Sequence, residues 1–200
     1  MLIEELERLT DEVVDKVVQR IEDHIDRVQY FYNLMVKAGI IPKEYIRQNE
    51  VDEHDADKLE PHNLERQSLR YCIPQDEMTP EDIEDIDNVI REHIKSNPHH
   101  CEYWGVGDHH TKGMDCSSMP IEEIFIMVAD WTATAEEKGG KNAWDWFNKC
   151  VVNVGGDRWI FTDEQIEIIK ACLEFLEDKV DPSLKRDYGL HSFDPAVLHN

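Results

Sequence analysis

Apolar residues recur at every third or fourth position through residues 2–38. The series consists of Leu6, Leu9, Val13, Val17, Ile21, Ile25, Val28, Tyr32 and Met35. This spacing places them along one face of a helix, and charged residues occupy the other face. We therefore predict a helical segment over 2–38, either as one long helix or as two with a bend near Thr10. Gly39 and Pro42 then end it.

Four further helices are predicted downstream. One opens at Thr79, where "TPED" combines a capping threonine, a proline in the first turn and an acid three residues after the cap. Two others are expected over 120–137 and over roughly 141–152. The last begins at "FTDEQI", where Thr162 and Gln165 are predicted to form a capping box.

Two segments lack a helical pattern. The first is "EVDEHDADKLEP", residues 50–61, and the second is residues 96–119, with four histidines, three acids and three glycines. A loop as long as the second is usually functional or disordered, and its aromatic pair "YW" favours an ordered one. A short strand or hairpin is predicted in "VVNVGGDRWIF", around Gly155-Gly156.

The pattern predicts an all-α fold, with no internal repeat or low-complexity linker. We expect a single helical domain over 1–180, in which residues 1–20 could be an N-terminal helical extension, and a C-terminal tail over 181–200. The long amphipathic first helix could serve a homodimer as readily as a core.

Composition narrows the class of protein. The formal net charge of −23 disfavours a nucleic-acid duplex as partner, because phosphate backbones are bound by clustered Lys and Arg. A small phosphorylated substrate remains compatible if a metal ion supplies local positive charge. No apolar run approaches the roughly 20 residues that cross a bilayer, and the acidic start is unlike a signal peptide. The five cysteines form no CxxC pair. We therefore expect a cytoplasmic protein that does not bind membranes.

Three polar residues are predicted to face the interior. His24 lies on the apolar stripe of the first helix, Asp130 follows the apolar run "IFIMVA", and His93 follows Ile90 on the inward face of its helix. Each has a structural alternative, since the histidines could bond backbone carbonyls and Asp130 could pair with Arg27 or with another distant arginine, Arg91. A buried carboxylate needs a cation, however, and few basic residues are near in sequence.

Further metal-ligand types occur at His54-Asp55 and at His99-His100. Imidazole and carboxylate donors without cysteine suit divalent Mn, Fe, Co, Ni or Zn, rather than a structural zinc site. We therefore predict a divalent metal centre, with Mg as a further candidate.

The order His…His-Asp…Asp, with each part on its own helix, resembles the HD-domain superfamily of metal-dependent phosphohydrolases. "HDADK" also resembles the HD-x-x-K form of that superfamily. The blocks "NPHHCEYW" and "MPIEEIFIMVADW" are similar to an uncharacterised HD-like family of bacterial and viral proteins. The resemblance covers about residues 20–150.

The resemblance implies a fold, a set of metal ligands and a reaction. The fold would be an HD-domain-like helical bundle with a long metal-site loop. One metal ion would be bound by His24, His54, Asp55 and Asp130. A second would be bound by His93 with His99 or His100.

The implied enzyme uses metal-activated water to hydrolyse a small phosphate ester, a nucleotide being one candidate. Asp55 would help to orient the water, and Lys58 would stabilise the phosphoryl oxygens. Lys58 could equally be a surface lysine paired with nearby acids. Tyr103 and Trp104 could form an aromatic wall for the substrate, or could only close a core.

Two other functions remain open at this point. Some HD-fold proteins hold a di-iron centre on nearly the same ligands and are oxygenases. The chain could also be a non-enzymatic acidic helical interaction protein with structural histidines.

Overall fold

Helices account for most of the chain in the computed structural model, which describes residues 9–108, 110–140, 143–184 and 188. The predicted all-α class is confirmed. Among the described helices, none is both long and apolar enough to cross a membrane. The first eight residues and most of the predicted tail lie outside the described residues.

The chain divides into two compact units, each assembled from segments that are distant in sequence. Unit 1 comprises Met1–Asp23, Asp55–His93 and Asp187–Asn200, and unit 2 comprises His24–His54 and Ile94–Arg186. The units are therefore not successive domains along the chain. That residues 1–180 act as one domain stays a prediction.

The long helix α2 (Asp11–Ala38) contributes to both units, since its residues up to Asp23 belong to unit 1 and the others to unit 2. The helix begins at Asp11, so Leu9 and Thr10 of the predicted segment 2–38 are not helical, and residues 2–8 of that segment lie outside the described residues. Within α2, the predicted apolar stripe is largely buried, with Val17, Val28 and Met35 at 0% exposure, while Val13 and Ile25 are half-buried.

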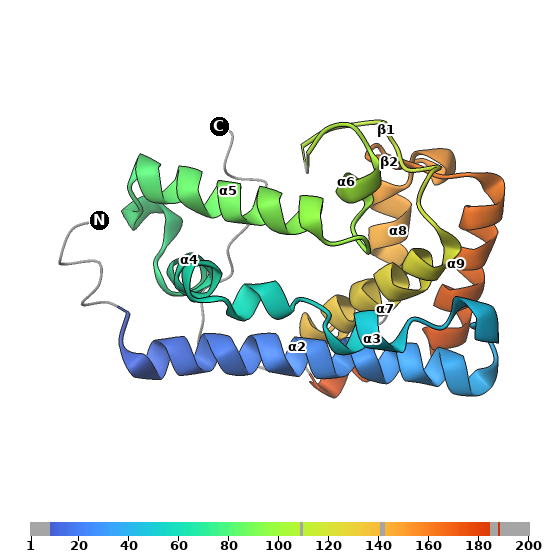
Figure 1. The fold of residues 1–200 in the computed structure, drawn as a ribbon, viewed down its shortest axis with the longest axis horizontal. Coiled ribbons are helices and arrows are strands. Elements are labelled where there is room, and N and C mark those ends of the chain that lie inside the picture. Colours follow the sequence, from blue (N-terminus) through green and yellow to red (C-terminus); the bar gives the residue numbers. More distant parts are fainter. Residues whose placement is uncertain (1–8, 109, 141–142, 185–187, 189–200) are drawn as a thin grey trace. The chain divides into compact units, whose positions relative to one another are not determined.

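Unit 1 continues through the 3-10 turn η2 (Ala56–Leu59), α4 (Pro61–Cys72), the turn η3 (Gln75–Glu77) and α5 (Pro80–Ser96), which is in unit 1 up to His93 (Figure 1). Its small core contains Leu69, Ile73 and Ile86. Arg66 of α4 pairs with Asp82 and Asp85 of α5 at 3.7 and 3.6 Å.

The predicted start of α5 is confirmed. The Thr79 hydroxyl accepts a hydrogen bond from the Asp82 backbone N–H at 3.1 Å, and the Asp82 carboxylate accepts one from the Thr79 backbone at 3.3 Å. Helix α4 was not predicted. Its sequence, "PHNLERQSLRYC", offers few large apolar residues.

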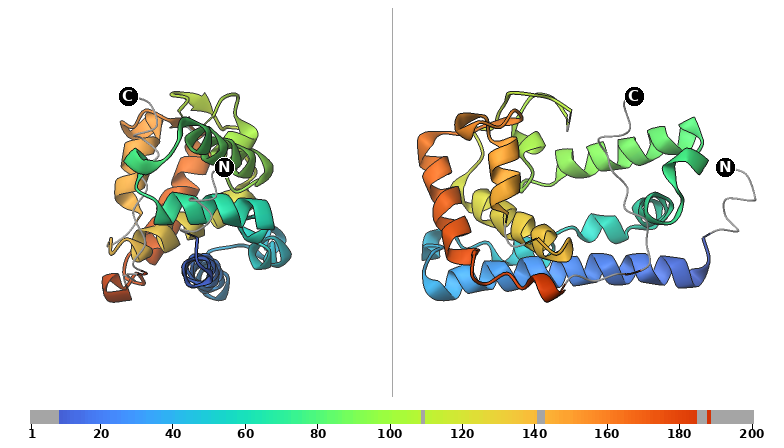
Figure 2. Two further views of the ribbon diagram at one scale, coloured as in Figure 1. Left: turned by 90° about the vertical axis from the view of Figure 1, so that its left-hand side faces the viewer. Right: turned by 180° about the vertical axis from the view of Figure 1, so that it is seen from behind.

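Unit 2 is organised around α7 (Ile121–Glu137), which packs against α9 (Asp163–Leu176) (Figure 2). Ile124 to Ala129 are all buried, so α7 is covered on every side in this stretch. Both helices were predicted, and the capping box of Thr162 and Gln165 is present at the start of α9.

Shorter elements complete unit 2. They are η1 (Lys43–Tyr45), α3 (Gln48–Asp52), α6 (Cys101–Trp104), β1 (Met114–Asp115), α8 (Trp144–Cys150), η4 (Val152–Val154), β2 (Trp159–Ile160) and η5 (Pro182–Leu184). The long segment 96–119 is therefore ordered where it is described, with α6 and β1 inside it.

The structure confirms the short strand predicted in "VVNVGGDRWIF", which is β2, but differs from two details predicted after residue 140. Helix α8 ends at Cys150 rather than near Val152, because Val151 turns to an extended conformation and the Cys150 carbonyl accepts from the Arg158 backbone. The glycines Gly155-Gly156 do not form a hairpin. The strand lies after them, and β2 instead pairs in parallel with β1 from the long loop.

Candidate metal centre and adjoining pocket

Helix α2 places His24 in the interior of unit 2. The side chain is on the same face as Val17 and Val28, and the residue is only 8% exposed. Its Nε2 lies 3.1 Å from Asp130 Oδ1 of α7. His24 faces inward, as predicted. It can contact Asp130 because both residues belong to unit 2.

The other nitrogen of the same ring is held by an acid that the sequence analysis did not identify. His24 Nδ1 lies 3.0 Å from Glu137 Oε1. When Nδ1 carries the proton and donates it to Glu137, Nε2 presents a lone pair toward Asp130. A carboxylate that orients a histidine in this way is the usual partner of metal-ligating histidines.

Asp130 is less buried than predicted, because its side chain keeps 16% exposure. Two arginines were considered as partners of the Asp130 carboxylate, but in the contacts described each pairs with another acid. Arg27 pairs with Glu136 at 3.4 Å, and Arg91 pairs with Asp87. The Thr134 hydroxyl, one turn along α7, lies 3.5 Å from Asp130 Oδ1.

His54 completes the group from the segment after α3. It is 3% exposed, and its ring centroid lies 5.7 Å from that of His24. One ligand atom each from His24, His54 and Asp130 can be chosen so that all three lie within 4.8 Å of one another. Donor atoms at this spacing can share a single ion, so unit 2 holds a group of buried and part-buried residues that could bind a metal.

His99 and His100 also belong to unit 2. The His99 ring centroid is 4.2 Å from that of His54 and equally far from that of His100. His99 is buried at 5% exposure, whereas His100 lines a larger pocket. His99 thus contacts one member of the three-residue group, His54, and His100 lines the same pocket as another member, Asp130.

Three other predicted site residues, Asp55, Lys58 and His93, lie in unit 1. His93 Nε2 is 3.2 Å from Asp55 Oδ1, and His93 Nδ1 is 2.7 Å from Asp57 Oδ2. The Lys58 ammonium lies 2.5 Å from Asp55 Oδ2. Lys58 is thus paired with a nearby acid, as its structural alternative predicted. The predicted role of Lys58 toward phosphate stays a prediction.

The backbone at Asp55 is unusual. Among the described residues, it is the non-glycine residue with a positive φ, 56°, in the left-handed region. Asp and Asn tolerate this conformation better than other residues, and such positions cluster at functional sites. The conformation aims a 1%-exposed carboxylate at both Lys58 and His93.

Burial is the largest single influence on the pKa of His93 and of Asp57, but their polar contacts together decide the direction of each shift. Burial and the Lys58 charge act to lower the pKa of His93, but Asp55 and Asp57 outweigh them and raise it. Burial and the Asp55 charge act to raise the pKa of Asp57, but the hydrogen bond to His93 and the charges of His93 and Lys58 together lower it. The contact between His93 and Asp57 at 2.7 Å thus contributes both to the raised pKa of His93 and to the lowered pKa of Asp57.

Comparison with known proteins places the chain in a family. The model of a protein family matches residues 14–174, a range that includes every predicted metal ligand. The family is described as a family of unknown function, DUF5662. The chain belongs to DUF5662. No curated protein and no solved structure matches it. The description of DUF5662 names no activity, so the function of the centre has to be inferred from its residues.

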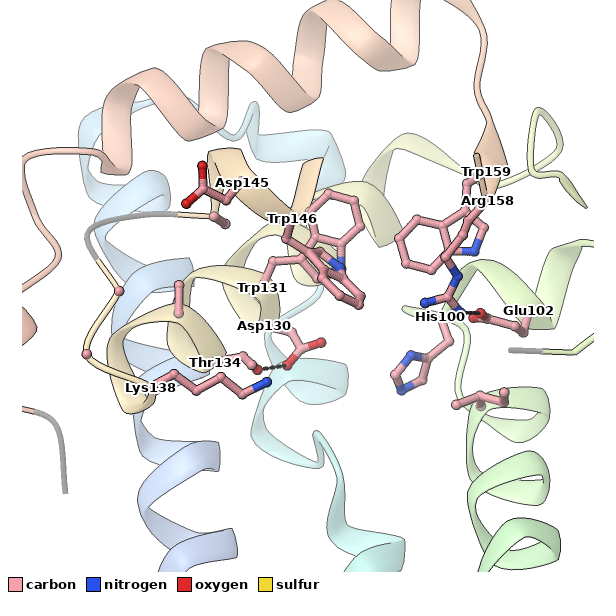
Figure 3. Close-up of a pocket in the computed structure, with 15 residues that line it drawn as sticks. His100, Glu102, Asp130, Trp131, Thr134, Lys138, Asp145, Trp146, Arg158 and Trp159 are labelled. Carbon is pink, nitrogen blue, oxygen red and sulfur yellow. Dashed lines mark hydrogen bonds and ion pairs between the residues drawn. The ribbon is translucent and has the colours of Figure 1, made fainter. Parts of the chain in front are cut away.

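This DUF5662 chain has a pocket beside Asp130, also within unit 2. The cavity has a volume of about 500 Å³ and is lined by residues of α6, α7, α8 and β2, among them Trp131, Trp146 and Trp159 (Figure 3). Tyr103 and Trp104, the predicted aromatic wall, do not line it. Tyr103 is 44% exposed, and the Trp104 indole donates to the Pro98 carbonyl at 2.7 Å.

The site residues that the sequence analysis missed differ in whether a sequence pattern could have revealed them. Glu137 and Thr134 follow Asp130 at seven and four residues, so helical spacing alone places them on the same face. The tryptophans gave no such signal, because Trp159 joins the pocket through the pairing of β2 with β1.

Proposed function

We propose that this member of DUF5662 is a metal-dependent phosphohydrolase, in which His24, His54 and Asp130 hold a divalent metal ion. The observation that carries the proposal is the convergence of these three side chains to within 4.8 Å from three separate segments. The order of the same residues in the chain, together with the HD-x-x-K motif that begins at His54, supports the reaction class.

The donor set fits a catalytic metal rather than a structural one. Two imidazoles and one carboxylate suit Mn, Fe, Co, Ni or Zn, and three protein ligands leave coordination positions for water and substrate. When bound, such an ion polarises a phosphoryl oxygen and lowers the pKa of water towards neutrality. The resemblance adds Asp55, the residue after His54, as a further ligand.

The chain's own residues then have distinct tasks. Glu137 keeps His24 in the tautomer that presents Nε2. The resemblance, rather than the described geometry, gives Lys58 the role of a cation for the phosphoryl oxygens, in keeping with its place in the motif. In the overall reaction, the oxygen of water bonds to phosphorus, the ester P–O bond breaks, and the leaving alkoxide takes up a proton, giving an alcohol and phosphate.

The first experiment measures metal content and phosphate release. The chain is purified without a His-tag, its metals are analysed, and nucleotides and general phosphate esters are screened with Mn²⁺ or Co²⁺. We expect a transition metal to co-purify and at least one ester to be hydrolysed.

Variants connect that result to the centre. His54→Ala and Asp130→Ala should each lower bound metal and reduce phosphate release by more than about 100-fold, beyond the effect of losing an outer partner. His62→Ala, an exposed histidine of α4, is the matched control and should change neither.

Other outcomes would favour the alternatives. Bound iron with a visible charge-transfer band and oxygen uptake, without phosphate release, would point to an oxygenase. If both variants leave metal content and melting temperature unchanged, the metal centre is refuted and an interaction protein is favoured.

A further inference from the structure

The cavity beside Asp130 has a wall of three tryptophans. The rings of Trp131 and Trp159 are nearly parallel, with 11° between their planes and 5.6 Å between their centroids, and these residues are 8% and 5% exposed. Trp146 meets Trp159 edge-on at 6.1 Å and stays 38% exposed. Two buried indoles thus support a third that is open to a ligand.

The wall is fixed in place by charge as well as by packing. The Arg158 guanidinium lies 4.7 Å from the centroid of Trp159 and 5.8 Å from that of Trp146. It also pairs with Glu102 at 3.3 Å. Arg158 is therefore engaged by two rings and a carboxylate, and these contacts organise the aromatic surface before any ligand binds.

The opposite side of the cavity is polar and adjoins the metal centre. Asp130 and Thr134 on α7 and Lys138 at its C-terminal cap follow one another at four-residue spacing, and Figure 3 shows the side chains of Asp130 and Lys138 pointing to the same end of the cavity. A molecule that contacts Trp146 can therefore extend to a metal ligand and to an ammonium group without leaving the pocket.

We propose that the tryptophan wall binds a flat aromatic group of the substrate, so that the enzyme prefers phosphate monoesters that carry a heterocyclic base over aliphatic ones. The reaction in this inference rests on the proposed function, whereas binding of the ring does not. A cavity of about 500 Å³ is within the usual range for small-molecule sites, and a tryptophan face stacks well on any base. Lys138 faces the phosphate of such a ligand.

Binding is tested on the full chain as purified, by isothermal titration calorimetry with adenosine, which has no phosphate to hydrolyse. We expect adenosine to bind and Trp146→Ala to weaken it about tenfold, the effect of losing one stacked ring. Trp146→Phe should restore much of the affinity. Tyr30→Ala, which removes a 55%-exposed aromatic ring of α2, is the matched control and should bind adenosine normally.

Selectivity is tested by comparing kcat/KM for adenosine 5′-monophosphate and ribose 5-phosphate with Mn²⁺. The wild-type chain should favour the nucleotide, and Trp146→Ala should reduce that ratio about tenfold while leaving kcat/KM for ribose 5-phosphate nearly unchanged. Lys138→Ala should raise KM for both esters and leave adenosine binding unchanged.

The possible failures are distinguishable. Adenosine binding that depends on Trp146, with no ester hydrolysed, would support the aromatic site and refute the phosphohydrolase. Hydrolysis of both esters with equal kcat/KM, without adenosine binding, would refute the aromatic site and leave the phosphohydrolase in place.

Discussion

At the scale of single residues, the contact between Glu137 and His24 is the most informative one in the candidate centre. Glu137→Gln keeps the shape of the side chain and removes its charge, so His24 loses the anion that fixes its tautomer. We expect metal affinity to fall by about 10- to 100-fold, as for other outer partners of metal-binding histidines. Titration of the metal-free chain with Mn²⁺ or Zn²⁺ measures this.

The control for that titration is Glu167→Gln on the exposed side of α9, where the glutamate pairs only with the neighbouring Lys170 in the contacts described. It should bind metal like the wild type. Equal affinities for the Glu137 and Glu167 variants would mean that Glu137 does not support the centre.

A second residue-scale prediction concerns Glu123 in the first turn of α7. Burial, a hydrogen bond with Glu50 and the charges of Glu50 and Glu122 raise the pKa of Glu123 to about 8, against the opposing effect of Arg47. The folded state therefore binds more protons than the unfolded state between the ordinary pKa of 4.5 and about 8. Stability from this group is complete below pH 4.5 and is lost as the pH rises through 8.

Glu123→Gln imitates the protonated acid and should remove this loss. The difference in unfolding free energy between variant and wild type should grow in favour of the variant by up to about 1.4 kcal/mol per pH unit over that window. Urea unfolding at pH 5, 6.5 and 8 measures it. A difference that stays constant with pH would show that Glu123 is ionised throughout.

Part of the candidate metal centre could be predicted because polar residues occur on apolar helix faces. His24 and Asp130 stood out because a polar residue among apolar ones on one helix face has to be satisfied inside. Glu137 did not stand out, because a glutamate at the end of a helix is ordinarily solvated. Its role depends on the packing of α7 against α2, which no local pattern encodes.

At the scale of elements, the capping box of α9 gives the clearest test. The Thr162 hydroxyl accepts from the Gln165 backbone at 3.2 Å, and the Gln165 side chain accepts from the Thr162 backbone at 2.8 Å. Thr162→Ala should lower the free energy of unfolding by about 1 kcal/mol, and Thr162→Ser should retain most of it. Chemical unfolding followed by circular dichroism measures both, and equal stability of the two variants would contradict the cap.

The helices and strands also show which elements a sequence pattern can predict and which it cannot. Helices α7 and α9 carry dense apolar periodicity and cap signals, and both were predicted. Helix α4 has its buried side largely in Arg66, Gln67 and Ser68, so periodicity in apolar residues could not reveal it. Strands β1 and β2 are two residues each, and their pairing joins segments more than 40 residues apart in sequence, which only the folded chain reveals.

At the scale of the whole molecule, the division into units could not be read from the sequence, because each unit combines separate segments. The excess of acidic over basic residues, in contrast, follows directly from the sequence, and it affects the stability of the folded chain. A chain with a formal charge of −23 repels itself when compact, and a bound divalent cation offsets part of that repulsion.

Metal binding should therefore stabilise the folded chain by mass action. With free Mn²⁺ at about 100 times its dissociation constant, the unfolding free energy should rise by about 2.7 kcal/mol, and a chelator should reverse the gain.

The unfolded chain also contains ten histidines that can bind metal, so two variants are needed to assign the gain to the folded centre. His54→Ala and His62→Ala each remove one histidine from the unfolded chain, but only His54 belongs to the folded centre. The gain should vanish in the first variant and persist in the second, as measured by thermal unfolding with and without metal. If both variants keep it, the ion is bound elsewhere, and the convergence of His24, His54 and Asp130 has another purpose.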